Sequence, residues 1–342
     1  MNRLRHPLAV SAVLGLTMAF TSPITLAQKV DVRGVTRGTF AGWSDVLLME
    51  SKNTPVRAVL APSVGARILA YGFGKENILW TNPNAAGSQY RPGEAPFDPG
   101  GFVCAIGPEV VSQPPHPLTL LGPYSWSTKK KAYVVLKGPE DPGVGVEMEK
   151  EVAYDPASGD LGFVHRIKNI SDRDAAFCLW HRIACQPGGF ALFPINKKSR
   201  FSSGWAIRQD IGGKIHYEDT RPESPAVRVL DGILVARTGG TLTKIGADSA
   251  AQWLAYAHGR TLFVIHFPFY SSAVYSDAGH SVTVAWDETK TELQPLSPEA
   301  RLRSRKSYEF PIKWSLIALP AEVTSHEAAR ALADQIPGSP FL

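Results

Sequence analysis

Short stretches of alternating apolar and polar residues recur along this chain from residue 38 to residue 319. Alternation with a period of two residues is typical of β-strands that bury one face. Clusters of Gly, Pro, Asn and Asp, as in YDPASGD (154–160) and NISDRD (169–174), separate the stretches and favour turns. The segment SHEAARALADQI (325–336) instead has helical periodicity, with Thr324 or Ser325 suited to cap a helix. The pattern predicts an all-β sandwich, a single domain over residues 28–342, with a short C-terminal helix.

The first residues have a pattern of their own. Arg3 and Arg5 precede an apolar run over residues 8–20, and TLA (25–27) supplies a small-residue cleavage site. This order is typical of a secretory signal peptide, so we expect cleavage after residue 27 and a periplasmic or secreted protein. The apolar run is shorter than the ~20 residues that span a membrane, so we expect no stable membrane insertion. The alternative is that this segment is not cleaved and anchors the protein in the membrane.

The charge of the chain argues against a nucleic-acid partner. The formal net charge is +5, and removal of residues 1–27 takes away two arginines and no acidic residue, which leaves +3. The most compact basic cluster, Lys129 to Lys131, lies between expected strands and is typical of a solvated turn. The sequence does not indicate an oligomeric state.

The segment CLWHRIACQPGG (178–189) offers two cysteines and a histidine. On a helix, Cys178, His181 and Cys185 would share a face and form a plausible metal site. On a strand, Cys178 faces away, and His181 and Cys185 lie about 13 Å apart. Apolar residues alternate around His181, so we expect a strand, no metal and no cofactor.

The cysteines also bear on redox state. Three cysteines leave an odd one in an oxidising compartment, and two on one strand cannot pair. Buried free thiols are favoured over a bridge from Cys104 to one of the others. A catalytic thiol is not supported, because the flanking residues are apolar.

The tripeptide His-Arg-Ile occurs twice, at residues 165–167 and 181–183. The NISDRD turn between the two copies predicts a β-hairpin that places His165 and His181 on neighbouring antiparallel strands.

Four segments resemble the galactose mutarotase-like, or aldose 1-epimerase-like, superfamily. They are GARILAYGFGKENILWTNP (65–83), GGFVCAIGPE (100–109), FVHRIKNISDRDAAFCLWH (163–181) and TELQPLSPEARLRSRKSYEFPIKWSL (291–316). The resemblance is closest to uncharacterised, mostly secreted bacterial members. It implies a β-supersandwich, with two large antiparallel sheets and a sugar-sized cleft across one concave face. A mono- or oligosaccharide is the ligand that it implies.

The resemblance also implies catalytic residues. His181 matches the general acid that donates to the ring oxygen, and Glu292 matches the general base that takes the anomeric hydroxyl proton. The two groups must converge on one sugar ring. Each also has a structural interpretation: a hydrogen-bonded strand histidine and a solvated strand-edge acid.

Five further residues are candidates for substrate binding: Arg67, Glu109, His116, His165 and Trp180. The enzymes of the superfamily carry a sugar-binding histidine before their glycine pair, whereas Asp98 and Pro99 precede the pair here. His116 is a candidate to substitute for it from a loop, and the alternative is that no residue does so. Each of the other four also has a structural interpretation. Arg67 and Glu109 could be solvated surface residues, His165 a buried neighbour that hydrogen-bonds His181, and Trp180 a tryptophan of the core.

Three functions are compatible with these residues. The first is an aldose epimerase or mutarotase that uses His181 and Glu292. The second is a non-catalytic carbohydrate-binding protein on the same fold. The third, a polysaccharide lyase, is the weakest, because the chain has no room for the helical domain of most lyases. A fold alone does not decide among them.

Overall fold

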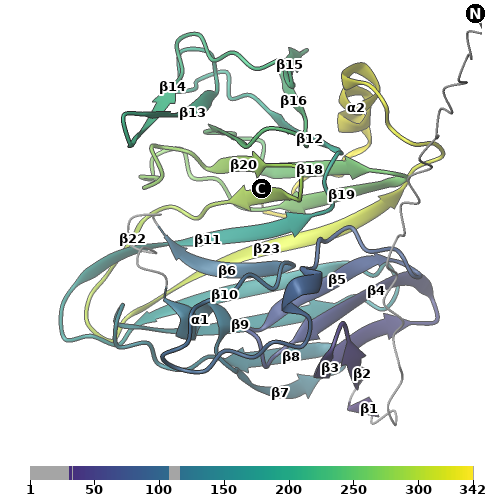
Figure 1. The fold of residues 1–342 in the computed structure, drawn as a ribbon, viewed down its shortest axis with the longest axis vertical. Coiled ribbons are helices and arrows are strands. Elements are labelled where there is room, and N and C mark those ends of the chain that lie inside the picture. Colours follow the sequence, from purple (N-terminus) through teal and green to yellow (C-terminus); the bar gives the residue numbers. More distant parts are fainter. Residues whose placement is uncertain (1–30, 33, 108–115, 342) are drawn as a thin grey trace, which may run out of the picture.

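The computed structural model describes residues 31–32, 34–107 and 116–341, and it is built almost entirely of β-strands (Figure 1). The predicted signal peptide and Glu109 lie outside these residues. Within the described part of the chain, no helix is long and apolar enough to cross a membrane.

The strands form two large antiparallel sheets, which we call sheet I and sheet II. Sheet I runs from edge to edge as β1 (Asp31–Val32), β2 (Val35–Phe40), β3 (Trp43–Ser51), β4 (Thr54–Ala61), β5 (Arg67–Phe73), β6 (Phe102–Gly107), β11 (Ala175–Cys185), β21 (Thr291–Pro295), β20 (Val282–Trp286), β17 (Thr243–Ala247), β13 (Ala206–Ile211) and β14 (Lys214–Glu218), and β22 (Ala300–Leu302) pairs with the start of β11. Sheet II runs as β15 (Val227–Leu230), β16 (Ile233–Arg237), β12 (Phe190–Pro194), β18 (Trp253–His258), β19 (Thr261–His266), β23 (Ser307–Ala318), β10 (Leu161–Asn169), β9 (Val146–Tyr154), β8 (Tyr133–Lys137) and β7 (Ser125–Lys130).

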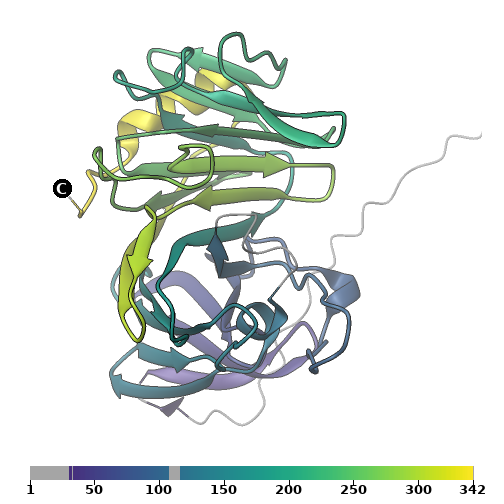
Figure 2. The same cartoon turned by 90° about the vertical axis from the view of Figure 1, so that its left-hand side faces the viewer.

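The sheets pack face to face, and the largest buried cluster takes residues from both (Figure 2). β9 and β10 alternate strictly between buried and half-buried residues, as the period-two pattern predicted. β11 differs, because most of its residues are buried on both faces. It lies in the middle of sheet I, where Leu120 packs against Ala105, Trp180 and Leu296 on the side away from sheet II. The all-β sandwich prediction is therefore confirmed.

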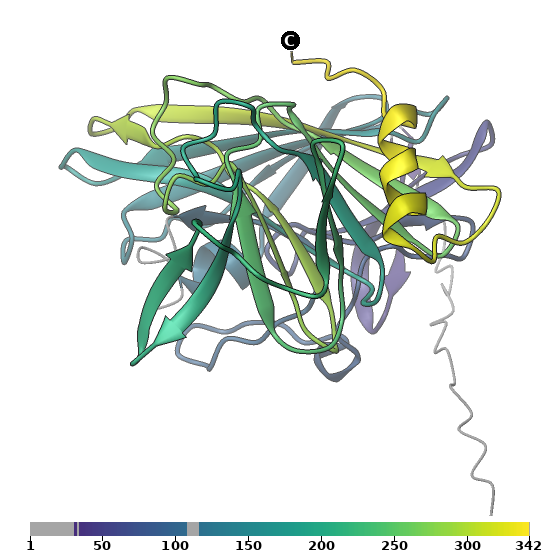
Figure 3. The same cartoon turned by 90° about the horizontal axis from the view of Figure 1, so that it is seen from above.

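The predicted C-terminal helix is present as α2 (His326–Leu332), which continues into η2 (Ala333–Gln335). The Ser325 hydroxyl caps α2 by accepting a hydrogen bond from Ala328 N at 3.1 Å. Ala329 and Leu332 join a buried cluster with residues of β12 and β16, so α2 covers one part of sheet II (Figure 3). The remaining helices are η1 (Pro83–Ala85) and α1 (Pro117–Leu121).

The predicted hairpin between the two His-Arg-Ile copies is wrong. β10 pairs with β9 and β23 in sheet II, whereas β11 pairs with β6 and β21 in sheet I. The NISDRD segment carries the chain from one sheet to the other. Both strands have the alternation expected for a buried face, but that alternation does not say which strand is the neighbour. The two copies therefore face each other across the core.

Candidate functional site

Two adjacent residues of β11, His181 and Arg182, point to opposite faces of sheet I. Side chains alternate along a strand, and Leu179 and Ile183 belong to the core between the sheets. His181 therefore points into the core, and Arg182 points away from sheet II. We call the side of sheet I that carries Arg182 the outer face.

His181 is fully buried and has two hydrogen-bond partners. Its Nδ1 lies 3.1 Å from the carbonyl oxygen of Pro295, and its Nε2 lies 3.2 Å from Nδ1 of His165. A carbonyl oxygen only accepts, so Nδ1 of His181 carries the proton. Burial lowers the pKa of His181 to about 3, although the hydrogen bond to Pro295 opposes the shift. At neutral pH, His181 is an uncharged histidine of the core.

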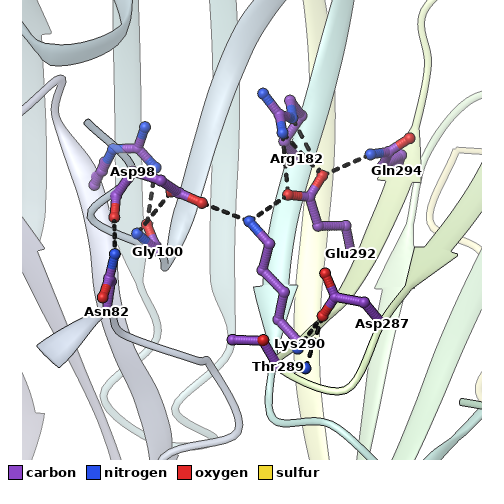
Figure 4. Close-up of polar contacts among 10 residues, drawn as sticks. Asn82, Asp98, Gly100, Arg182, Asp287, Thr289, Lys290, Glu292 and Gln294 are labelled. Carbon is purple, nitrogen blue, oxygen red and sulfur yellow. Dashed lines mark hydrogen bonds and ion pairs between the residues drawn. The ribbon is translucent and has the colours of Figure 1, made fainter. Parts of the chain in front are cut away.

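Glu292 of β21 lies on the outer face, at the centre of an ion-pair network (Figure 4). Arg182 donates from Nη2 to Oε1 at 3.0 Å and from Nε to Oε2 at 3.2 Å. Lys290 Nζ lies 2.9 Å from Oε1 and also pairs with Asp98. Gln294, two residues further along the same strand face, donates to Oε2 at 2.7 Å. Both carboxylate oxygens of Glu292 are therefore occupied by the protein's own donors.

These contacts determine the charge of Glu292. Burial alone would raise its pKa, but attraction to Arg182 and Lys290 and hydrogen bonds from Lys290 and Gln294 lower the pKa to about 2. The side chain of Arg182 is 38% exposed, so the network is buried on one side and meets solvent on the other. Glu292 is a stable carboxylate near neutral pH and a weak proton acceptor.

The loop over residues 82–100 brings Asp98 to this network. Asn82 donates to the Asp98 carbonyl oxygen at 2.8 Å, and an Asp98 carboxylate oxygen accepts from Gly100 N at 2.9 Å (Figure 4). Arg67 of β5 donates to the carbonyl oxygen of Gly100 at 2.8 Å. A Cβ atom at Gly100 would come within 2.4 Å of a backbone oxygen, so this close approach needs glycine. The loop is thereby fixed against the outer face.

Trp180 lies on the outer face beside Arg182. The Arg182 guanidinium carbon and Lys244 Nζ of β17 each lie 5.3 Å from the centre of its ring. Lys290 stands in the same way over Trp80, at 5.2 Å. Cations at such distances are attracted to an aromatic face. Each of these two indole rings therefore has at least one protein cation beside it.

Three buried nitrogen atoms on or over this face have no hydrogen-bond partner among residues 31–32, 34–107 and 116–341: Arg67 Nε, Trp180 Nε1 and His280 Nε2. His280 stands directly over β17, because a Cβ atom at Gly246 would lie 2.4 Å from its ring. Buried polar atoms without partners cost about 1–3 kcal/mol each and often indicate an absent ligand or water. The outer-face cluster is therefore defined by Arg67, Trp180, Arg182, Lys244, His280, Lys290, Glu292 and Gln294.

The expectation that His181 and Glu292 face each other is wrong. Ala184 is the register partner of Glu292, and it lies three residues from His181, on the opposite side of β11. The sheet itself separates the two groups. Sequence comparison had matched each residue to a family position without fixing the direction of its side chain.

The other candidates divide between the two sides of sheet I. Arg67 and Trp180 share the outer face with Glu292, whereas His165 joins His181 in the core. His116 lies immediately before α1, whose Leu120 packs beside Trp180. Glu109 is not among the described residues.

Sequence reasoning missed Arg182, Lys290 and Gln294. A signal for two of them was present. Arg182 follows His181 directly and must point to the opposite face, whereas Gln294 is two residues from Glu292 and must share its face. Lys290 lies before β21, and no periodic pattern marks it.

No family model matches the sequence, and no curated protein matches it. Solved structures do match the fold. A candidate aldose 1-epimerase from Klebsiella pneumoniae superposes with a TM-score of 0.55 at 12% identity, covering 88% of this chain and 86% of the other. A galactose mutarotase-like protein from Lactobacillus casei gives 0.53 at 13% identity, covering 79% and 100%.

The fold is galactose mutarotase-like. The resemblance inferred from sequence is thereby confirmed at the level of the fold. The galactose mutarotase-like fold also matches part of a TPR-domain containing protein from Parabacteroides distasonis, with a TM-score of 0.57 at 12% identity over 88% of this chain and 54% of the other. At sequence identities this low, the similarity shows a shared fold and does not show a shared chemistry.

Proposed function

We propose that this protein binds a mono- or oligosaccharide on the outer face of sheet I, as a carbohydrate-binding or carbohydrate-processing protein. The observation that carries the proposal is a pair of buried N–H groups, Arg67 Nε and Trp180 Nε1, that find no partner in the described part of the chain and lie on the face of the Glu292 network. Sugar hydroxyl oxygens accept hydrogen bonds from such donors, and the C–H face of a pyranose packs on an indole ring.

The charge pattern supports a neutral or weakly charged ligand. Glu292 compensates Arg182 and Lys290, Asp98 adds a second carboxylate to Lys290, and Asp277 lies 3.4 Å from Lys244. Paired charges of this kind are rigid donors and acceptors for hydroxyl groups. They leave little net attraction for a strongly charged molecule.

Aldose epimerisation on the same face is the second candidate, favoured by the names of structural neighbours such as the candidate aldose 1-epimerase. Glu292 is ionised, as a base must be, but its pKa of about 2 makes it a poor one. His181 is in the core, so ring opening would need another acid. We therefore rank binding ahead of catalysis.

Calorimetric titration with a panel of aldoses and their oligomers tests the proposal. We expect saturable binding to wild type and a loss of about 10-fold or more in affinity for Arg182→Ala, because the outer-face cluster loses its most exposed donor. Arg301→Ala is the matched control, since that side chain is 86% exposed and pairs only with Glu299 among the residues described. Absence of binding by every saccharide would refute the proposal.

Polarimetry on freshly dissolved anomers of the same sugars distinguishes the two candidates. Mutarotation faster than in buffer, slowed by Glu292→Gln, would favour the epimerase. Binding without acceleration would favour the binding protein.

Export belongs to the same proposal. The N-terminal pattern supports a mature protein that begins at Gln28, in the periplasm or outside the cell. Mass spectrometry of the protein recovered from the cell envelope and the medium tests this, and a chain with residues 1–27 intact in the cytoplasm would contradict it.

A further inference from the structure

The core between the sheets holds three metal-binding side chains that the saccharide site does not use. They are Cys104 of β6, His165 of β10 and His181 of β11, all buried, and one ligand atom from each lies within 4.8 Å of the others. Cys104 is the register partner of His181, and His165 reaches across from sheet II. The site thus draws on both sheets and on three separate strands.

We propose that Cys104, His165 and His181 form a buried site for one copper(I) ion. The sequence prediction of no metal concerned Cys178, His181 and Cys185, which strand geometry separates. Folding supplies His181 with two different neighbours, and neither is near it in sequence. A thiolate with two imidazoles is a soft, three-ligand set that is typical of copper.

The hydrogen bonds of His181 prepare it as a ligand. Its Nδ1–H donates to the carbonyl oxygen of Pro295, so the lone pair of its Nε2 points toward His165. Histidines that bind metals usually donate their other N–H to a carbonyl or a carboxylate in this way. The carbonyl of Pro295 therefore fixes the tautomer and the ring direction that a metal needs.

The distance between the two histidines also fits a shared ion. His165 Nδ1 and His181 Nε2 are 3.2 Å apart. Donors bonded to one ion at about 2.0–2.3 Å lie about 3–4 Å from one another. Without metal, His165 donates its Nδ1 proton to His181. With metal, that proton moves to Nε2 of His165, and both lone pairs face the ion.

Charge favours copper(I) over zinc. Binding replaces the proton of the Cys104 thiol, which is released to solvent, so a copper(I) thiolate with two neutral imidazoles has no net charge. Zinc would leave one positive charge in the core, where the buried Lys150 already acts on both histidines as a like charge. Uncompensated buried charge is costly. The side chains that pack on the two histidines supply no negative charge, because they are the aromatic rings of Phe102, Phe163 and Phe310.

Because the site is fully buried, the test loads it during folding. Full-length protein is unfolded with reductant and chelator, then refolded without oxygen in copper(I) acetonitrile complex, with zinc sulfate in a parallel sample. Copper per chain is measured after gel filtration against a copper(I) chelator. We expect about one equivalent in wild type and a loss of at least about 10-fold in Cys104→Ser and His165→Gln.

Cys178→Ser and Cys185→Ser are matched controls, since both thiols are also buried and free. We expect them to retain the copper. X-ray absorption of the loaded wild type gives a readout that needs no variant to fold, and we expect one sulfur and two imidazole nitrogens. The proposal is overturned if wild type takes up no copper, if Cys104→Ser keeps it, if the controls lose it equally, if the spectrum has no sulfur, or if zinc binds in preference.

Discussion

The two faces of β11 treat polar side chains in opposite ways. On the core side, His181 and His165 are uncharged and share hydrogen bonds within an apolar, aromatic surrounding. On the outer side, Arg182 and Glu292 keep their charges because each compensates the other and solvent reaches the arginine. The difference shows that one step along a strand, from residue 181 to residue 182, changes which protonation state is stable.

The largest expected effect on the core side is that of His181→Ala. The change leaves a cavity and removes the partner of both the Pro295 carbonyl and His165, so we expect the free energy of unfolding to fall by about 3–5 kcal/mol. Arg182→Ala, one residue away, should cost only about 1 kcal/mol, because its ion pair is partly solvated. Urea unfolding of the two variants makes the comparison.

An equal loss of stability in both variants would contradict the assignment of the two faces. For saccharide affinity we expect the opposite order of the two variants. Any folded His181→Ala protein should bind as wild type does, whereas Arg182→Ala should not.

The second expected effect is a loss of stability at low pH, and it arises from Glu292 on the outer face. The folded-state pKa of Glu292, about 2, lies below its ordinary value of 4.5. A lowered carboxyl pKa stabilises the fold fully above the unfolded-state value, and this contribution is lost as pH falls from about 4.5 toward 2. This lowering of the Glu292 pKa from 4.5 to about 2 corresponds to a stabilisation of about 3 kcal/mol.

Glu292→Gln should therefore be less stable than wild type at pH 6, and the deficit should shrink as pH falls below about 4.5 and be nearly gone only below about pH 2. Urea melts at several pH values measure the difference between the two proteins. Glu288→Gln, which changes an exposed carboxylate in the turn before β21, should follow wild type throughout. A Glu292→Gln deficit that did not shrink in acid would disprove the ionic origin of the stabilisation.

The sequence was sufficient for the strands and for the C-terminal helix, because burial of one face imposes a period of two and Ser325 marks a helix start. The sequence did not show which strands pair with each other. The run around His165 and the run around His181 have equivalent patterns, and only three-dimensional packing decides that they belong to different sheets.

The candidate site was limited by the same cause. Arg67 and Glu292 were named from the family resemblance and Trp180 as an aromatic ring that can stack on a sugar, and the structure brings all three to one face. His181 was named with them, but its direction depends on strand parity relative to the core. Applying the period of two along β11 would have placed Arg182 on the face opposite to His181, but only the pairing of β11 with β21 brings it to Glu292. Lys290 and Asp98 lie in connections, whose conformation no alternation predicts.

The smallest predicted effect is a change in saccharide affinity on removal of one indole N–H, and it compares two tryptophans. Trp180, on the outer face, and Trp314, in the core, each have a buried indole N–H for which the described residues offer no partner. Trp180→Phe keeps an aromatic ring against Ala105 and Leu296 and removes the N–H. We expect saccharide affinity to fall about 5–10-fold, which is about 1 kcal/mol, with the free energy of unfolding changed by less than about 0.5 kcal/mol.

Trp314→Phe removes the same group from the core, where no ligand reaches it. The smaller ring leaves space among Tyr71, Phe163 and Phe263, so we expect a loss of about 1–2 kcal/mol in stability and unchanged saccharide affinity. Titration and urea unfolding of both variants give four measurements. If Trp180→Phe binds as tightly as wild type, its free N–H is not a ligand contact, because removing an unpartnered donor can alter binding only where a ligand oxygen accepts from it.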